Sequence, residues 1–251
     1  MNTPACCDSE PEIHRRRTLL KAALGAAALG SVGFAGLGIS GPAYAQALTE
    51  AERDRLTPDG IIEMLKAGNE RFRTGKMQQH DYLAQKRATI GSQYPAAMIL
   101  SCIDSRAPAE IIMDTGIGDA FNARVAGNVV NDDLIGSMEF ACRITGAKVI
   151  VVMGHTACGA IKGAIDGAQL GHLTALLDKI KPAVAATHYD GERTSKNAAF
   201  VDEVAKTNVH MNINEIRQHS SVLADLEREG KIKMVGALYR FEGGRVEFLD
   251  A

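Results

Sequence analysis

The sequence predicts a single α/β domain: a mainly parallel β-sheet with helices on both faces and one antiparallel edge strand. Two short runs dominated by apolar residues, Ala97–Ser101 and Lys148–Met153, are typical of strands that are buried on both faces. Segments with helical spacing of apolar residues alternate with the strand candidates, which favours right-handed crossovers in a parallel sheet. A Gly-Gly pair near the C-terminus predicts a hairpin that adds the antiparallel strand.

Two helices are expected ahead of the first strand. Thr57 is a typical N-cap residue, and Pro58 fits the first helical position that follows it. Apolar residues then recur at helical spacing until Gly75, which ends the segment. A second helix is expected over Tyr82–Ile90.

A weaker strand and a helix are expected between the two apolar runs. The strand candidate covers Ala120–Val125. The helix covers Leu134–Ile144, and Gly146 ends it. Asp132 and Asp133, directly before this helix, are interpreted as its cap.

The remaining chain predicts four helices and a terminal hairpin. The helices are expected at about Cys158–Ile165, Leu173–Ile180, Asn197–Ser220 and Val222–Glu229. The longest carries its apolar residues on one stripe, namely Ala198, Val201, Ala205, Val209, Ile213 and Ile216. The hairpin joins strands at Ile232–Tyr239 and Val246–Leu249 through Gly243 and Gly244.

Composition excludes several classes of protein. The chain has 251 residues, which is enough to bury a full core without a disulfide framework. Its 28 Lys and Arg residues nearly balance 30 Asp and Glu residues, so the excess positive charge typical of nucleic-acid binding is missing. Aromatic residues make up 5%, with no Trp, which argues against stacking on single strands. We therefore expect a small-molecule substrate and no nucleic-acid partner.

Residues 1–45 are typical of an export signal peptide. A basic segment, Arg15–Lys21, precedes an uncharged stretch, Ala22–Ile39, and Ala43–Ala45 supplies an A-x-A cleavage site. An uncharged stretch of this length is at the lower limit of a membrane span, so a retained anchor is the alternative. Its many glycines favour cleavage, which leaves residues 46–251 as the folded domain with no membrane contact.

The basic segment resembles the twin-arginine export signal. The run Arg16–Lys21 carries the resemblance, although Arg15 and Leu19 depart from the usual pattern. The resemblance implies transport to the periplasm in a folded state, often with a metal already inserted. Cys6 and Cys7 would leave with the signal.

Two motifs follow the two strongest strand candidates. Cys102-Ile103-Asp104-Ser105-Arg106 comes directly after the first, and His155-Thr156-Ala157-Cys158-Gly159 comes after the second. The carboxyl ends of parallel strands meet at one edge of the sheet, where ligands bind, so we expect Cys102, His155 and Cys158 to lie together. Two thiolates and an imidazole suit Zn²⁺ and leave a fourth position open, as in catalytic sites. Cys158 also opens a predicted helix, whose dipole would lower the pKa of its thiol.

Asp104 has two roles open to it. Its carboxylate could act as a fourth metal ligand and close the site. Alternatively it pairs with Arg106 and accepts a hydrogen bond from a metal-bound water, whose pKa the metal lowers from 15.7 towards roughly 7. The sequence leaves both roles open.

The two motifs together resemble those of the β-class carbonic anhydrases. Supporting stretches are Gly68–Phe72, Arg124–Asn128, Gly154–Ala160, and Val235–Ala237 followed by Tyr239. The similarity runs from about Asp59 to Leu249. The resemblance implies an α/β fold with an N-terminal helical arm that embraces a partner, and therefore a homodimer or a tetramer of dimers.

The resemblance also implies a site and a reaction. Cys102, His155 and Cys158 would be zinc ligands, with one Zn²⁺ per subunit, and Asp104 and Arg106 would form the catalytic dyad. The implied reaction is reversible hydration of CO₂ to bicarbonate and a proton by zinc-hydroxide attack.

Several alternatives accompany this interpretation. The same site could act on carbonyl sulfide or carbon disulfide, or the domain could be a non-catalytic zinc-binding module. A disulfide between Cys102 and Cys158 is the alternative to a metal site in an oxidising compartment. Cys142 is interpreted as a small core residue. His172 and His210 are interpreted as surface groups, either of which could relay protons.

Overall fold

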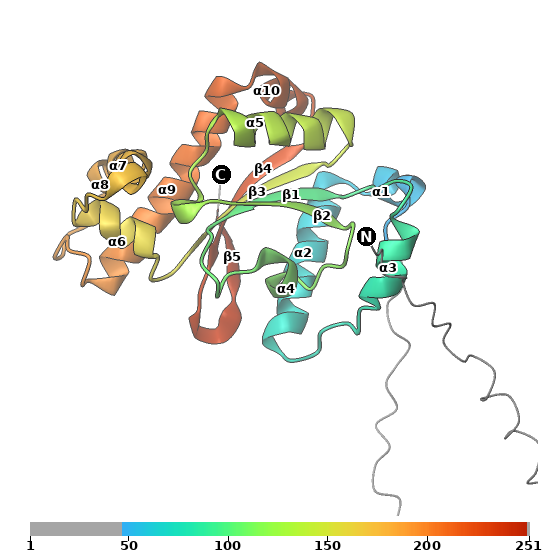
Figure 1. The fold of residues 1–251 in the computed structure, drawn as a ribbon, viewed down its shortest axis with the longest axis horizontal. Coiled ribbons are helices and arrows are strands. Elements are labelled where there is room, and N and C mark those ends of the chain that lie inside the picture. The colour runs from blue at the N-terminus through green and yellow to red at the C-terminus, as the bar shows by residue number, and fades with distance from the viewer. Residues whose placement is uncertain (1–46, 250–251) are drawn as a thin grey trace, which may run out of the picture. The chain divides into compact units, whose positions relative to one another are not determined.

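The computed structural model describes residues 47–249 (Figure 1). The expected export signal, residues 1–45, lies outside this range, so the signal and its cleavage stay predictions.

A five-stranded sheet forms the centre of the fold. The strands, in spatial order, are β2 (Ala120–Arg124), β1 (Ala97–Ser101), β3 (Val149–His155), β4 (Lys233–Tyr239) and β5 (Val246–Leu249). The first four are parallel, and β5 is antiparallel to β4. Every residue of β1 and β3 is buried, as their unbroken apolar runs predict. The predicted fold class is confirmed.

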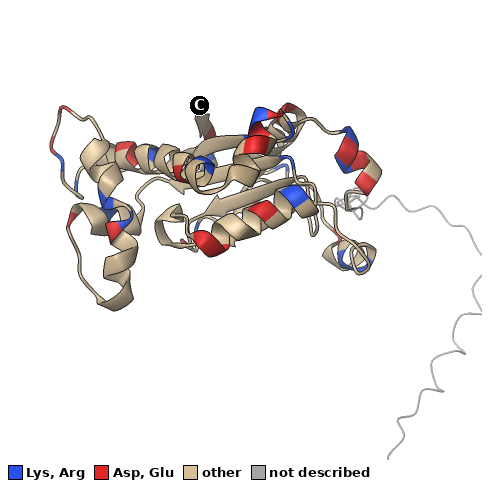
Figure 2. Cartoon of the chain, turned by 90° about the horizontal axis from the view of Figure 1, so that it is seen from above, with Lys and Arg blue, Asp and Glu red and all other residues tan. Residues whose placement is uncertain are grey.

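Helices cover both faces of the sheet (Figure 1). On one face α2 (Pro58–Arg73) and α4 (Ala109–Ile112) pack against alternate side chains of the central strands. On the other face lie α5 (Asp132–Glu139), α9 (Ala198–His219) and α10 (Ser221–Arg228). The alternation of the strand side chains thus divides the core into two layers. Acidic and basic residues are interspersed along the helices (Figure 2).

The N-terminal helices follow their caps. The hydroxyl of Thr57 accepts a hydrogen bond from the N–H of Gly60 at 3.1 Å, and α2 begins at Pro58 as predicted. One helix here, α1 (Glu50–Arg55), was not predicted; it begins at a capping box between Thr49 and Glu52. The next helix, α3 (Tyr82–Ala88), ends two residues before the predicted end.

The predicted cap of α5 is wrong. Asn131 caps this helix, because its side-chain oxygen accepts the N–H of Leu134 at 2.9 Å. Asp132 and Asp133 lie in the first turn, where their negative charge still favours the helix dipole. The second half of the predicted helix is a π-helical turn, Phe140–Ile144.

The helices after β3 differ from the prediction in one place. The first, α6 (Gly159–Ile165), begins directly after Cys158, as expected. Instead of one helix at 173–180 there are two, α7 (Gly171–Asp178) and α8 (Lys181–Ala186). Pro182 lies in the first turn of α8. Proline is tolerated in the first turn of a helix but breaks a helix interior, so α7 does not continue into α8. Within residues 47–249, no helix combines the length and the hydrophobicity that crossing a membrane requires.

Candidate metal centre

Three predicted ligands converge at the carboxyl edge of the sheet. Cys102 follows the last residue of β1, His155 is the last residue of β3, and Cys158 is the N-cap of α6. Because β1 and β3 are neighbouring parallel strands, their ends lie side by side. One ligand atom from each of the three residues lies within 4.8 Å of the other two. The predicted juxtaposition is confirmed.

The three side chains are buried, and neither thiol is in a disulfide. Cys102, His155 and Cys158 are 4%, 1% and 1% exposed. The thiols of Cys102 and Cys158 form no disulfide in this structure. The disulfide alternative therefore does not describe this state of the protein.

The histidine presents one nitrogen to the centre. Its Nδ1 lies 2.9 Å from the carbonyl oxygen of Thr156, a position from which Nδ1–H donates and Nε2 keeps its lone pair. Nε2 is buried and has no hydrogen-bond partner within the part of the chain that the structure describes. A buried acceptor without a donor is costly, and a cation between Nε2 and the thiols would remove that cost. The donor set, two sulfurs and one imidazole nitrogen, fits zinc.

The two thiols share one proton. The hydrogen bond from Cys158 lowers the pKa of Cys102 against the opposing effect of burial, and the N–H of Gly127 contributes. Cys158 keeps its proton, because the adjacent Cys102 sulfur raises its pKa. The backbone N–H groups of Ala160 and Ile161, at the start of α6, lower the pKa of Cys158 in the predicted direction, but the Cys102 sulfur and burial outweigh them. Metal binding must displace this remaining proton.

Asp104 lies at the edge of the trio, held by Arg106. Its Oδ1 accepts the backbone N–H and the Nε–H of Arg106 at 2.9 and 3.0 Å, and its Oδ2 accepts the Nη2–H at 2.8 Å. These hydrogen bonds keep the pKa of Asp104 far below its usual range. Oδ2 also lies 3.9 Å from Nε2 of His155. Of the two roles open to Asp104, the structure has the pairing with Arg106; ligation of the metal stays a prediction.

Phe241, whose role was not predicted, contacts both Arg106 and His155. The ring centroid lies 4.1 Å from the guanidinium carbon of Arg106 and 5.0 Å from the ring centroid of His155. The backbone N–H of Phe241 donates to the hydroxyl of Thr156 at 3.1 Å. An aromatic residue just beyond the end of β4, at the same sheet edge, is the signal that could have identified it.

Asp202 and Arg124 were also missed. Asp202, on α9, accepts the N–H of Ala157 at 3.3 Å, and burial raises its pKa. Ala157, which lies between the candidate ligands His155 and Cys158, has a φ of +54°, a strained conformation for a residue with a side chain. Arg124, at the end of β2, donates from Nε to the carbonyl of Cys102 at 2.9 Å. No spacing rule links these residues to the motifs, because their contacts are long-range.

The other candidates lie elsewhere. Cys142 is buried in the π-helical turn, as expected of a core residue. His172 is exposed on α7 and His210 is half-buried on α9, so a proton relay through either stays a prediction.

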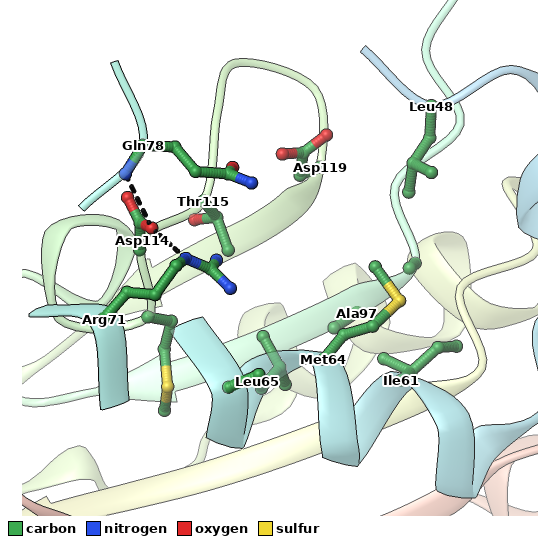
Figure 3. A pocket seen from close by; sticks show the side chains of 13 residues that line it. Leu48, Ile61, Met64, Leu65, Arg71, Gln78, Ala97, Asp114, Thr115 and Asp119 are labelled. Carbon is green, nitrogen blue, oxygen red and sulfur yellow. Dashed lines mark hydrogen bonds and ion pairs between the residues drawn. The ribbon is translucent and has the colours of Figure 1, made fainter. Parts of the chain in front are cut away.

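A separate cavity of about 210 Å³ lies between α2 and the start of β1. Figure 3 shows its apolar floor, which includes Leu65 and Met64, and a polar end formed by Arg71 and Asp114. The buried carboxylate of Asp114 accepts Nε–H of Arg71 at 2.5 Å and the backbone N–H of Gln78 at 3.1 Å. These groups satisfy one another, which is typical of a structural network.

Comparisons with known proteins agree on one family. The family model described as carbonic anhydrase matches residues 97–246. Carbonic anhydrase 2 of Mycobacterium tuberculosis is 34% identical over 199 residues, which cover 77% of this chain and 93% of the relative.

A solved structure and a second relative add detail. One of the structures described as two tetrameric beta-carbonic anhydrases from Sordaria macrospora superposes with a TM-score of 0.56 at 26% identity, covering 64% of this chain and 83% of the other. The carbon disulfide hydrolase of Acidithiobacillus thiooxidans is 37% identical over 98 residues, covering 36% of this chain and 45% of the relative.

Proposed function

The chain belongs to the β-class carbonic anhydrase family, and we propose that it catalyses the reversible hydration of CO₂ to bicarbonate and a proton. Carbonic anhydrases are zinc enzymes, and Cys102, His155 and Cys158 would hold one zinc ion. Zinc, when bound, lowers the pKa of a coordinated water and so supplies a nucleophile near neutral pH. The remaining chemistry belongs to side chains of this chain.

Asp104 orients the attacking water. The hydrogen bonds from Arg106 keep the Asp104 carboxylate ionised at every working pH, so it accepts hydrogen bonds and donates none. A water whose hydrogen points at Oδ2 presents a lone pair to the carbon of CO₂. The same low pKa makes Asp104 a poor base, so the proton released by the reaction goes to solvent rather than to this carboxylate.

Burial and exposure divide the site into two parts. The ligands are closed off from water, whereas the side chains of Asp104 and Arg106 are 16% and 59% exposed. The dyad therefore borders the route by which CO₂ enters and bicarbonate leaves. Stacking on Phe241 limits the motion of the exposed guanidinium and keeps it on Asp104.

The observation that carries the proposal is the buried Nε2 of His155, which has no hydrogen-bond partner among residues 47–249 and lies with the sulfurs of Cys102 and Cys158 in a group whose atoms are within 4.8 Å of one another. We expect Cys158→Ala and the metal-stripped protein to lose CO₂ hydration in a stopped-flow assay with a pH indicator, and Cys158→Ala to lose zinc by metal analysis. Cys142→Ala is the matched control, because it removes a buried thiol outside the trio and should keep both zinc and activity. Full CO₂-hydration activity in Cys158→Ala would contradict the proposal.

A second substrate class has one observation in its favour. The carbon disulfide hydrolase aligns with part of this chain. Carbon disulfide, like CO₂, is a linear molecule whose central carbon is attacked by water. Sulfide release from carbon disulfide or carbonyl sulfide, measured beside CO₂ hydration on the same preparation, separates the two. We favour CO₂, because the carbonic anhydrase relative matches most of its own length and of this chain.

We further propose a homodimer or a tetramer of dimers. Among residues 47–249 the edge strand β2 pairs with β1 alone, and unprotected sheet edges invite pairing with another chain. Exposed apolar side chains nearby in the chain, Ile111, Ile117 and Phe140, favour burial against a second copy. Light scattering at micromolar concentration should give a dimer or a larger species; a monomer would contradict this proposal.

Export is proposed on the sequence of residues 1–45 alone. We expect the processed protein in the periplasm, and its retention inside the cell when Arg16 and Arg17 are both replaced by Lys. Fractionation with mass determination of the mature N-terminus tests this. Unchanged export of the double variant would contradict the twin-arginine route.

A further inference from the structure

Two asparagines interrupt the buried face of α9. Asn208 and Asn212 are 1% and 6% exposed and lie one helical turn apart. Burying an amide costs free energy unless its hydrogen bonds are made. Each amide makes one hydrogen bond to the loop that follows β2, and Nδ2 of Asn212 also donates to Asn208 within α9.

The two amides form a clamp on this loop. Nδ2 of Asn208 donates to the carbonyl oxygen of Gly127 at 2.8 Å. Oδ1 of Asn212 accepts the N–H of Val130 at 2.8 Å. Nδ2 of Asn212 donates to Oδ1 of Asn208 at 3.2 Å, which fixes the Asn208 amide with its own Nδ2 towards Gly127.

The clamped loop contacts the metal centre. The N–H of Gly127 donates to Sγ of Cys102 at 3.3 Å. Gly127 has a φ of +69°, and a Cβ there would lie 2.6 Å from Cδ1 of Ile180, so only glycine brings the backbone this close. Gly127 is therefore held at its carbonyl by Asn208 and at its N–H by the sulfur.

We propose that Asn208 is a positioning residue for the metal centre. By fixing the carbonyl of Gly127, it aims the N–H of the same residue at the Cys102 sulfur. That hydrogen bond draws charge from the thiolate and sets its direction, so it tunes the bond that the sulfur makes to a metal. The inference rests on the proposed function in one respect, that Cys102 is a zinc ligand.

The test replaces zinc with Co²⁺ and follows the thiolate-to-metal charge-transfer band. We expect Asn208→Ala to shift this band and to lose zinc to a chelator about tenfold faster than the unmodified protein, the lower end of the usual effect of outer-shell partners. Neither readout depends on catalysis.

Asn69→Ala is the matched control. Asn69 is 4% exposed, and its Nδ2 donates to the carbonyls of Ile112 and Gly244 at 3.2 and 2.9 Å. Its loss also leaves buried backbone groups unsatisfied, but not those beside the sulfur. A purely structural role for Asn208 predicts that both variants lose thermal stability while keeping the band and the zinc. That outcome would overturn the inference.

A second measurement covers the case in which Asn208→Ala does not fold. In ¹⁵N-labelled protein loaded with ¹¹³Cd, the hydrogen bond to the Cys102 sulfur should give a scalar coupling between the metal and the Gly127 amide. Absence of this coupling in a cadmium-loaded protein would overturn the inference. Failure of the unmodified chain to bind Co²⁺ or Cd²⁺ would instead defeat the proposed metal site, so the two failures are distinguishable.

Discussion

Arg106 matters to Asp104 mainly because it fixes the orientation of the carboxylate, and less because it keeps the carboxylate ionised. Two of its hydrogen bonds from Arg106 come from the guanidinium and one from the backbone N–H. The guanidinium is itself braced by the ring of Phe241. Removing the side chain therefore leaves an ionised carboxylate with too few bonds to fix it.

We expect Arg106→Ala to lower kcat about 10²-fold while zinc content stays unchanged, the usual result of misplacing a group near the reacting atoms. Loss of the guanidinium raises the pKa of Asp104 towards its ordinary value near ~3.9, so the carboxylate remains ionised above pH 6. The deficit should therefore be equal at pH 6 and pH 9 in stopped-flow assays. A deficit that disappears at high pH would show that Arg106 acts on protonation instead. Arg106→Lys keeps the charge without the planar fork and should recover only part of the rate.

Replacement of Gly127 by alanine should destabilise the folded protein. Gly127→Ala requires a positive φ at a residue with a side chain and pushes Cβ against Ile180. We expect a loss of about 2–4 kcal/mol in the free energy of unfolding, measured with urea. Gly75→Ala is the control, since Gly75 has the same φ of +69° with nothing within 4 Å of its Cβ position, and it should cost only about 1–2 kcal/mol.

The contrast between these two variants tests the contact itself. Ile180→Val removes the Cδ1 atom nearest to the added Cβ, so Gly127→Ala should cost less in that background. Equal losses for the Gly127 and Gly75 variants would show that the loop can move away from Ile180.

At the scale of elements, the strands and most helices followed their patterns, whereas the shortest helices did not. The buried strands and α9 were predicted within one or two residues, because a long apolar pattern reflects the burial that stabilises them. The short helices α1, α4 and α8 were missed, since segments of four to six residues gain their stability from packing rather than from a readable period. The cap of α5 was displaced by one residue for a similar reason: Asn131 and the two aspartates are all acceptable caps.

The π-helical turn after α5 gives a prediction on stability against pH. It holds Cys142 against the core, where burial raises the pKa of the thiol to about 12. The unfolded chain releases this proton above about pH 8.5, and the folded chain does not. Between these values the unfolded state binds fewer protons, so stability falls as pH rises, by at most about 1.4 kcal/mol per pH unit.

Cys142→Ala removes this contribution. We expect urea unfolding of the zinc-loaded protein, measured from pH 8 to pH 10.5, to show a shallower decline in the variant than in the unmodified chain. The comparison concerns the slope, because the variant also loses some packing at every pH. Identical slopes would show that the thiol titrates normally in the folded protein.

At the scale of the whole molecule, topology explains why the convergence of the candidate ligands could be predicted and the contacts of their supporting residues could not. Cys102 and His155 stand at the ends of neighbouring parallel strands, so the order of elements alone brings them together. Asn208, Asp202 and Phe241 reach the same edge from α9 and from the segment after β4. Their contacts depend on how whole helices and strands pack, and no short sequence motif indicates that packing.

Without a metal, the two thiols of the centre are susceptible to oxidation, because the fold holds them close together. The fold brings the sulfurs of Cys102 and Cys158 within 4.8 Å of each other, and both are free. The hydrogen bond from Cys158 lowers the pKa of the Cys102 thiol, which favours its thiolate form in the metal-free pair. A thiolate beside a thiol is the arrangement that oxidants convert into a disulfide.

We therefore expect metal-free protein exposed to oxidised glutathione to form a Cys102–Cys158 disulfide, detected by peptide mapping and reversed by dithiothreitol, with loss of zinc binding until it is reduced. Zinc-loaded protein should resist, because both sulfurs are then bound to the metal. Cys142→Ala should behave like the unmodified chain in both states. Equal oxidation of loaded and metal-free protein would show that the metal does not shield the pair. A protective effect would be consistent with the proposed export in the folded state, since a chain that acquires zinc before it enters an oxidising compartment would arrive with its ligands already bound.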